Sequence, residues 1–359
     1  MPINLESLVQ SAVSSFLSYH YHHYHAREAR KVLKSIEKAK GPLPRQIVKY
    51  CDNYSRDVFG HHHFAGWLYV YSAVAGRFME GWIPDNYYGS IVVPKFKGDY
   101  ENVSSLRSLN STIFSDHSFP DILSYANGVF FDTECRVLPL NSIKGQLFAD
   151  QDRVVYKLNN SARGKGIFFF DRESFNLGAI YKLGNGLFQS FINQHEIFRE
   201  FAKESVATLR MTTVSEDDGT TSLRACYLRL GGRTDTHVRS ESHTRIPINL
   251  KSGAFHNVGF TTDWLEIDRH PTSKVKFEGK FIPAFDACVK LVTVLHRKVP
   301  YARCIGWDLA IDDKGEVRIM EWNAGHNDIK FGEATQGPCF SDLHWEQLKG
   351  GPPEIQIVW

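Results

Sequence analysis

The sequence predicts an α+β protein with mostly antiparallel sheets and a helical extension at its N-terminus. Apolar residues recur at intervals of three and four in residues 1–40, which is the period of an amphipathic helix. Between residues 150 and 325, short runs rich in β-branched and aromatic residues alternate with turn residues, and a single amphipathic helical stretch at 281–300 interrupts them. These strands and helices together predict an α+β architecture with mostly antiparallel sheets.

The first 150 residues combine helices with short strands. The segment KGPLP at 40–44 ends the first helix, residues 45–80 are again helical, and GWIPDNYYG at 81–89 is a turn. We expect SIVVPKF at 90–96 to be a short strand. We expect FPDILSYANGVFFD at 119–132 to be a helix followed by a strand. The later strands are DRVVYKL, KGIFFFD, GLFQSFI, VATLRMTTV, LRACYLRL, GWDLAI and VRIMEW.

Composition excludes several classes of protein. The chain of 359 residues is 42% hydrophobic and 23% charged, with a net charge of +2, which gives no reason to expect a nucleic-acid partner. The six cysteines are scattered without a CxxC pair, as in a reduced protein. The sequence has no run of about 18 apolar residues and no signal-peptide pattern at its start. We therefore expect a cytoplasmic protein without a membrane span.

A glycine-rich loop follows the first strand after residue 150. Lys157 ends that strand, and the loop NNSARGKG at 159–166 brings small residues, glycines and two cations before the next strand. Backbone amides in such a loop, together with a lysine, suit a polyphosphate. The alternative is an ordinary exposed hairpin turn, and the loop alone does not decide between them.

The next two strands carry polar residues that suit a nucleotide. Gln189 lies where a strand runs into an extended linker that could face an adenine. Thr208, Arg210 and Thr212 share one face of the following strand by the period of two. An arginine inside a strand is costly unless it is paired or bound to a ligand, so Arg210 is either a ligand-binding residue or half of a structural ion pair.

The segment CIGWDLAIDDKGEVRIMEWNAG, from Cys304 onward, predicts a hairpin with a magnesium site. Folding it about the DDKG turn puts Asp308 opposite Glu321, and Asn323 lies on the same face as Glu321. Two carboxylates and an amide oxygen suit Mg²⁺ held together with phosphates. The alternative is that Asp308 caps a turn and Glu321 pairs with a surface cation, but apolar neighbours on both strands argue against it.

In order and spacing, these stretches resemble the ATP-grasp enzymes, and among them the sugar-transfer-associated ATP-grasp proteins. The resemblance covers about residues 150–330, and its most specific part is HP followed by a glycine, IP and GWD. It implies two α+β lobes that clamp a nucleotide. The domains would then be a helical extension at 1–80, an N-terminal α/β lobe at 81–150, a small lobe at 151–200, a large lobe at 201–345 and a tail at 346–359.

The resemblance also implies roles for individual residues. ATP phosphates would contact Lys157 and a loop containing Ser161, Gly164, Lys165 and Gly166. Adenine would be lined by Gln189, Ser190, Phe191 and Ile192. One or two Mg²⁺ ions, which Mn²⁺ could replace, would be held by Asp308, Glu321 and Asn323. The catalytic cations facing the γ-phosphate or an acyl-phosphate would be Arg210 and Arg229.

The implied activity is an ATP-dependent carboxylate–amine ligase that works through an acyl-phosphate and releases ADP and phosphate. The implied substrates are an amino acid or amine and a sugar or uronic-acid carboxylate in surface polysaccharide assembly. Two alternatives stay open, a kinase acting on a sugar or polyol hydroxyl and a non-catalytic nucleotide- or glycan-binding module. The N-terminal region could dimerise or dock onto a glycan-assembly partner.

The sequence departs from the family pattern in two places. The segment after YLRLGG is crowded with cations, and Arg233, His237 and Arg239 could bind an acidic substrate, although a solvated loop would look the same. The lysine expected in the N-terminal lobe has no clear counterpart, and Arg107 and Lys144 are the candidates to replace it. Histidine runs at 19–25 and 60–64 suit aromatic packing or a partner contact better than a metal site.

Overall fold

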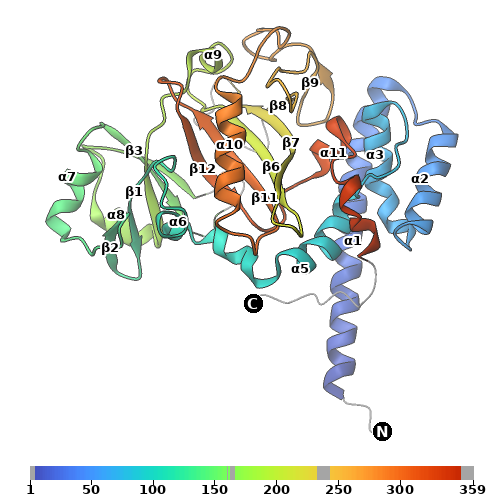
Figure 1. Ribbon diagram of the computed structural model, residues 1–359, viewed down its shortest axis with the longest axis horizontal. Coiled ribbons are helices and arrows are strands. Elements are labelled where there is room, and N and C mark those ends of the chain that lie inside the picture. Colours follow the sequence, from blue (N-terminus) through green and yellow to red (C-terminus); the bar gives the residue numbers. More distant parts are fainter. Residues whose placement is uncertain (1–4, 160, 162–165, 233–242, 349–359) are drawn as a thin grey trace. The chain divides into compact units, whose positions relative to one another are not determined.

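The computed structural model describes residues 5–159, 161, 166–232 and 243–348. The chain divides into two compact units (Figure 1). The first unit comprises residues 1–98, 263–266 and 326–359, and the second comprises residues 99–262 and 267–325. The fold prediction of an α+β protein with a helical N-terminal extension is confirmed.

The first unit is helical. Its helices are α1 (Leu5–Lys40), α2 (Arg45–Asp57), η1 (His62–Phe64), α3 (Ala65–Ala75), α4 (Asp85–Tyr87), η2 (Tyr88–Val92), α5 (Val93–Phe96), α11 (Lys330–Gln336), η6 (Ser341–Leu343) and η7 (Trp345–Gln347). Helices α1, α2 and α11 all pack against α3, where Trp67, Leu68 and Tyr71 are buried. No described helix is long and apolar enough to cross a membrane.

Part of the first histidine run packs as expected. The rings of Tyr21 and His25 on α1 lie 4.4 Å apart, as the i, i+4 spacing predicts. The ring of His22 stacks on His63 from the second run at 3.7 Å. Burial lowers the pKa of His22 and His25 to about 4 and that of His63 to about 3.

The strand expected at 90–96 is wrong. These residues form the end of the π-helical segment η2 and helix α5. Pro94 lies in the first turn of α5, where no backbone N–H is needed for a helical hydrogen bond, so proline is tolerated there. The β-branched residues before it favoured a strand, but packing within the helical unit overrides that preference.

The second unit contains a five-stranded sheet with the order β2-β1-β5-β3-β4. Its strands are β1 (Asp121–Ala126), β2 (Val129–Asp132), β3 (Arg153–Leu158), β4 (Ile167–Asp171) and β5 (Gly186–Ser190). Val154, Tyr156 and Phe188 bury one face of this sheet. That leaves the alternating residues, such as Val155 and Lys157, on the other face.

The helix expected in the first half of 119–132 is wrong, because that half is strand β1. Strands β1 and β2 form a hairpin whose turn residues Asn127 and Gly128 have φ of 50° and 92°. Asn-Gly is the preferred pair for such a turn. This hairpin joins β3–β5 in one sheet, so residues from the predicted domains 81–150 and 151–200 share it. The limits of the predicted domains remain a prediction.

A seven-stranded sheet with the order β10-β9-β8-β7-β6-β11-β12 completes the second unit. Its strands are β6 (Thr208–Ser215), β7 (Thr221–Leu230), β8 (Thr244–Pro247), β9 (Gly259–Phe260), β10 (Glu266–Ile267), β11 (Cys304–Ile311) and β12 (Val317–Asn323). Helix α10 (Phe285–His296) covers one face of the central strands (Figure 1). Cys288, Val292 and Leu295 of α10 pack into that core.

The remaining short helices of this part of the chain connect the strands. They are η3 (Gly98–Ser105), η4 (Arg107–Leu109), α6 (Asn110–Phe114), η5 (Leu140–Ser142), α7 (Ile143–Leu147), α8 (Leu177–Leu183) and α9 (Glu196–Arg199). The segment η4–α6 leads into β1 and contacts β1 and β5. It thereby brings Arg107 to the functional site described below.

Candidate functional site

The site is built on the hairpin of strands β11 and β12. Asp308 pairs with Glu321 and Gly306 with Asn323, which is the register expected from the sequence. Trp307 and Leu309 alternate with Asp308 and are fully buried, so the core fixes which face the carboxylates occupy. The Asp312 carboxylate accepts the backbone N–H groups of Lys314 and Glu316 and closes the turn.

Asp308 lies between two arginines from neighbouring strands. Arg210 Nε donates to Asp308 Oδ1 at 2.6 Å and Arg210 Nη2 donates to Oδ2 at 3.0 Å. Arg229 Nη2 also donates to Oδ1. Burial disfavours the charged form of Asp308, but the two arginines outweigh burial and lower its pKa below the ordinary value. Asp308 is therefore ionised, and two guanidinium groups share its charge.

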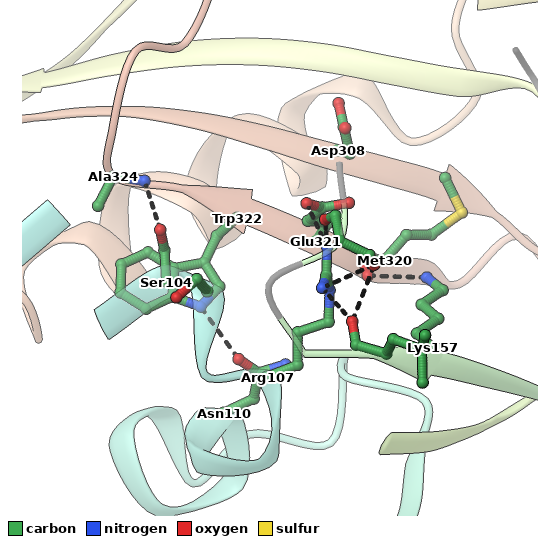
Figure 2. Close-up of polar contacts among 12 residues, drawn as sticks. Ser104, Arg107, Asn110, Lys157, Asp308, Met320, Glu321, Trp322 and Ala324 are labelled. Carbon is green, nitrogen blue, oxygen red and sulfur yellow. Dashed lines mark hydrogen bonds and ion pairs between the residues drawn. The ribbon is translucent and has the colours of Figure 1, made fainter. Parts of the chain in front are cut away.

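Arg107 connects the β11–β12 hairpin to the glycine-rich loop. Its Nη2 donates to Glu321 Oε1 at 2.9 Å, and Nη1 donates to the carbonyl of Leu158 at 2.6 Å (Figure 2). The same guanidinium donates to the carbonyl of Ser161 at 2.8 Å. Of the two residues expected to replace the missing lysine, Arg107 is therefore in the site. Lys144 lies exposed on α7, and no contact joins it to this site.

Lys157 approaches the same strand from the five-stranded sheet. Its Nζ donates to the backbone carbonyl of Met320 at 3.1 Å, next to Glu321 (Figure 2). Burial lowers the pKa of Lys157, while the carboxylate of Glu321 acts in the opposite direction. A lysine from β3 and an arginine from η4 thus converge on the Glu321 strand, an arrangement suited to a multiply charged anion.

The model of the family described as sugar-transfer associated ATP-grasp matches residues 177–341. This match confirms the resemblance to the ATP-grasp proteins. The matched segment contains β5–β12 and therefore the whole β11–β12 hairpin. No curated protein matches the chain.

Several solved structures resemble the chain weakly. An ADP complex of N5-carboxyaminoimidazole ribonucleotide synthetase is 11% identical, with 62% of this chain and 45% of that chain covered and a TM-score of 0.38. Biotin carboxylase from Campylobacter jejuni is 9% identical, with 67% of this chain and 45% of that chain covered and a TM-score of 0.42. The D-cycloserine synthetase DcsG is 13% identical, with 69% of this chain and 71% of that chain covered and a TM-score of 0.37. The chain spans less than half the length of the first two.

The strand expected to line adenine is held by partners that the sequence did not identify. Gln189 Nε2 donates to the carboxylate of Asp121 at 2.7 Å. The backbone N–H of Ser190 donates to the carbonyl of Pro120 at 2.7 Å, and that of Phe191 donates to Gln151 Oε1 at 3.2 Å. These two amides therefore bond within the protein. The roles of Gln189, Ser190, Phe191 and Ile192 toward adenine remain a prediction.

Only part of the expected phosphate loop is described. The Ser161 hydroxyl donates to the carbonyl of Leu158 at 2.8 Å, and Gly166 has φ of 73°. A Cβ on Gly166 would lie 2.8 Å from the Cβ of Ser161, so this position requires glycine on both counts. Gly164 and Lys165 lie outside the described residues, as do Arg233, His237 and Arg239 of the expected substrate loop.

The donor set on the hairpin fits magnesium. Asp308, Glu321 and Asn323 offer two carboxylates and one amide oxygen on neighbouring strands, the hard oxygen ligands that Mg²⁺ prefers. The described residues contain no cluster of three or more His, Cys, Asp or Glu side chains suited to a metal. A magnesium ion here would therefore need further oxygens from nucleotide phosphates or water, as is usual for this ion.

Proposed function

We propose that the protein is an ATP- and magnesium-dependent carboxylate–amine ligase that works through an acyl-phosphate. The carboxylate oxygen of one substrate attacks the γ-phosphorus of ATP, and ADP leaves. The nitrogen of an amine then attacks the acyl carbon, loses a proton and displaces phosphate. The overall products are an amide, ADP and phosphate.

The observation that carries this proposal is the convergence of Lys157, Arg107 and Glu321. Arg107 donates to the Glu321 carboxylate and to the carbonyl of Ser161 in the glycine-rich loop, and Lys157 donates to the backbone carbonyl of Met320, next to Glu321. A purely structural role for Glu321 would need one of these partners, whereas a nucleotide triphosphate carries several negative charges and needs both. Phosphoryl transfer depends mainly on positioning and on neutralising charge, and this arrangement can supply both.

Each residue then has a definite task. Lys157 and Arg107 bind phosphate oxygens and orient the triphosphate. Arg210 and Arg229 hold Asp308 ionised and face the transferred phosphoryl group or the acyl-phosphate. Mg²⁺ bound by Asp308, Glu321 and Asn323 would neutralise charge on the phosphates. Binding of nucleotide would give Arg107 an alternative partner to Glu321 and release that carboxylate.

We further propose an acidic acceptor, such as a uronic acid or another sugar-linked carboxylate, and an amino acid or amine as the second substrate. Arg229 on β7 and Arg245 on β8 are cross-strand partners, and the cationic segment from Arg233 onward connects these strands. Arginine binds carboxylate or phosphate through two parallel hydrogen bonds. The family description points to sugar transfer, which supports a glycan-linked substrate without identifying it.

Hydroxylamine provides the test, because it intercepts an acyl-phosphate as a hydroxamate. The full chain is incubated with ATP, Mg²⁺, hydroxylamine and a panel of uronic acids, and hydroxamate and ADP are measured together. We expect equal amounts of both for the right acid. ADP accompanied by a stable phosphorylated sugar, with no hydroxamate, would instead establish a kinase. Failure of the chain to bind ATP would leave a glycan-binding module as the better explanation.

A further inference from the structure

Asp121 and Gln189 form a hydrogen-bonded pair between neighbouring strands of the five-stranded sheet. Asp121 is the first residue of β1 and lies directly across from Gln189 on β5. Gln189 is only 2% exposed, and its Nε2 donates to Asp121 Oδ1 at 2.7 Å. Two polar groups in the interior of a sheet are costly unless their hydrogen bonds are satisfied.

The ionised carboxylate of Asp121 fixes the orientation of the Gln189 side-chain amide. Burial raises the pKa of Asp121 to about 6, against the effects of Gln189, Lys157 and Asn110, so the group is charged at neutral pH. A carboxylate only accepts hydrogen bonds, and an amide has a donor end and an acceptor end. The donor end of Gln189 must therefore face Asp121, and its Oε1 must point away from it.

The pair still has accepting capacity. Asp121 Oδ2 is buried, and among the described residues no donor, Asn110 included, lies within hydrogen-bond geometry of it. Within the same described part of the chain, Gln189 donates to Asp121 but its Oε1 accepts no hydrogen bond. A buried acceptor without a donor carries a desolvation cost. A ligand that brings N–H donors to this place would remove that cost.

The pair lies on the face of the sheet that also carries Lys157. Val155 pairs with Gln189 and Lys157 with Leu187, and residues 155 and 157 share a face by the period of two. The opposite face holds Val154, Tyr156 and Phe188 in the core. A nucleotide whose phosphates contact Lys157 would therefore lie along the face that carries the Gln189 side chain, with Asp121 beside it.

We propose that Asp121 sets the base preference of the nucleotide site, an inference that rests on the proposed function. By orienting Gln189, Asp121 leaves acceptor oxygens and no side-chain donor for the 6-position of a purine. The 6-amino group of adenine donates hydrogen bonds to such oxygens. The 6-oxygen of hypoxanthine or guanine only accepts and would face them unpaired. Asp121 is in this sense a positioning residue for Gln189.

The experiment compares ATP with ITP, which carries oxygen in place of the 6-amino group. Dissociation constants are measured with Mg²⁺ for the full wild-type chain, Asp121→Asn and Asp132→Asn. Asp132 at the end of β2 in the same sheet pairs with Arg136 at 2.7 Å and controls for the loss of a carboxylate. We expect wild type and the control to prefer ATP at least about tenfold, the effect of one lost buried hydrogen bond.

In Asp121→Asn the Gln189 amide is free to reverse, and we expect the preference to fall to about threefold or less. A preference retained in this variant, or absent in wild type, overturns the inference while leaving the nucleotide site intact. Binding of neither nucleotide to wild type overturns the proposed function as well. If Asp121→Asn does not fold, as judged by circular dichroism, the same ratio of ITP and ATP dissociation constants is measured for Gln189→Leu. We expect this variant to lose the preference for ATP, because it removes the Gln189 acceptor directly.

Discussion

At the scale of single residues, Asp308 holds together a charge arrangement that costs stability if it is broken. Its carboxylate is shared by Arg210 and Arg229, and all three side chains are largely buried. Removing one partner of a buried ion pair leaves uncompensated charge and costs about 3–5 kcal/mol. We expect Asp308→Asn to lower the free energy of unfolding in urea by about 3 kcal/mol at pH 7.

The matched control for Asp308 is Asp217→Asn. Asp217 also pairs with an arginine, Arg303, at 2.6 Å, but its side chain is 92% exposed. Surface pairs contribute about 0–1 kcal/mol, so this variant should unfold almost like wild type. Equal losses of unfolding free energy in the two variants would contradict the view that Asp308 balances the buried charge of two arginines.

Glu321 is the residue whose charge should matter most for activity. Glu321→Gln keeps the size of the side chain and an acceptor for Arg107, but removes the charge available to a metal. We expect ATP turnover to fall by about a hundredfold or more, as for loss of a main electrostatic group, with an unchanged circular dichroism spectrum. Glu316→Gln, in the turn of the same hairpin and paired with Arg318, serves as the control. Turnover close to wild type in Glu321→Gln would remove this residue from the metal site.

At the scale of elements, the turn between β1 and β2 tests how much one glycine contributes. Gly128 has φ of 92°, and a Cβ there would meet no atom within 4 Å. Any cost of Gly128→Ala therefore comes from the backbone, because L-residues in a left-handed conformation are strained by about 1–2 kcal/mol. We expect this variant to lower the free energy of unfolding by about that amount.

Gly145 in helix α7 offers the opposite case. A Cβ on Gly145 also meets no atom within 4 Å, but this residue lies in a helix, where alanine is favoured over glycine by about 1 kcal/mol. We expect Gly145→Ala to raise the free energy of unfolding. Changes of the same sign in both variants would show that something other than backbone conformation determines the effect.

At the scale of the whole molecule, buried titratable groups should give stability an optimum in pH. Burial raises the pKa of Glu333 to about 8. Its contribution to the free energy of unfolding is therefore lost as pH rises from about 4.5 to 8, because the folded chain holds a proton there that the unfolded chain has released. The lowered pKa values of His22, His25 and His63 act in the other direction. The contribution of these histidines to the free energy of unfolding is lost as pH falls from about 6.5 to 4, because the unfolded chain binds more protons there than the folded chain.

Below pH 6.5 the three histidines outweigh Glu333 and Asp121, whose raised pKa of about 6 acts in the same direction as that of Glu333, and between pH 6.5 and 8 the effect of Glu333 dominates. We therefore expect the thermal unfolding midpoint to be highest near pH 6.5 and to fall toward both pH 4.5 and pH 8. In Glu333→Gln the fall between pH 6.5 and 8 should disappear while the acid side persists. A midpoint that rises steadily to pH 8 in wild type would contradict the raised pKa of Glu333.

Local patterns determined much of the candidate site. The alternation of Trp307, Asp308 and Leu309 on one strand, and the turn residues that follow, were enough to predict the pairing of Asp308 with Glu321. The sequence also placed Lys157 at the end of a strand before a glycine-rich loop. These features depend on neighbouring residues and on the period of a strand, so they can be recognised without knowing the rest of the fold.

Other contacts were decided only by the tertiary structure. Arg107 reaches Glu321 across 214 residues of sequence, and the pairing of Asp121 with Gln189 depends on β1 joining the sheet next to β5. Arg229 meets Asp308 only because β6 brings β7 and β11 together. Such contacts follow from how sheets and connecting helices pack, whereas local propensity acts over a few residues. The sequence by itself thus determined the types of residue in the site, and the fold decided which of them meet.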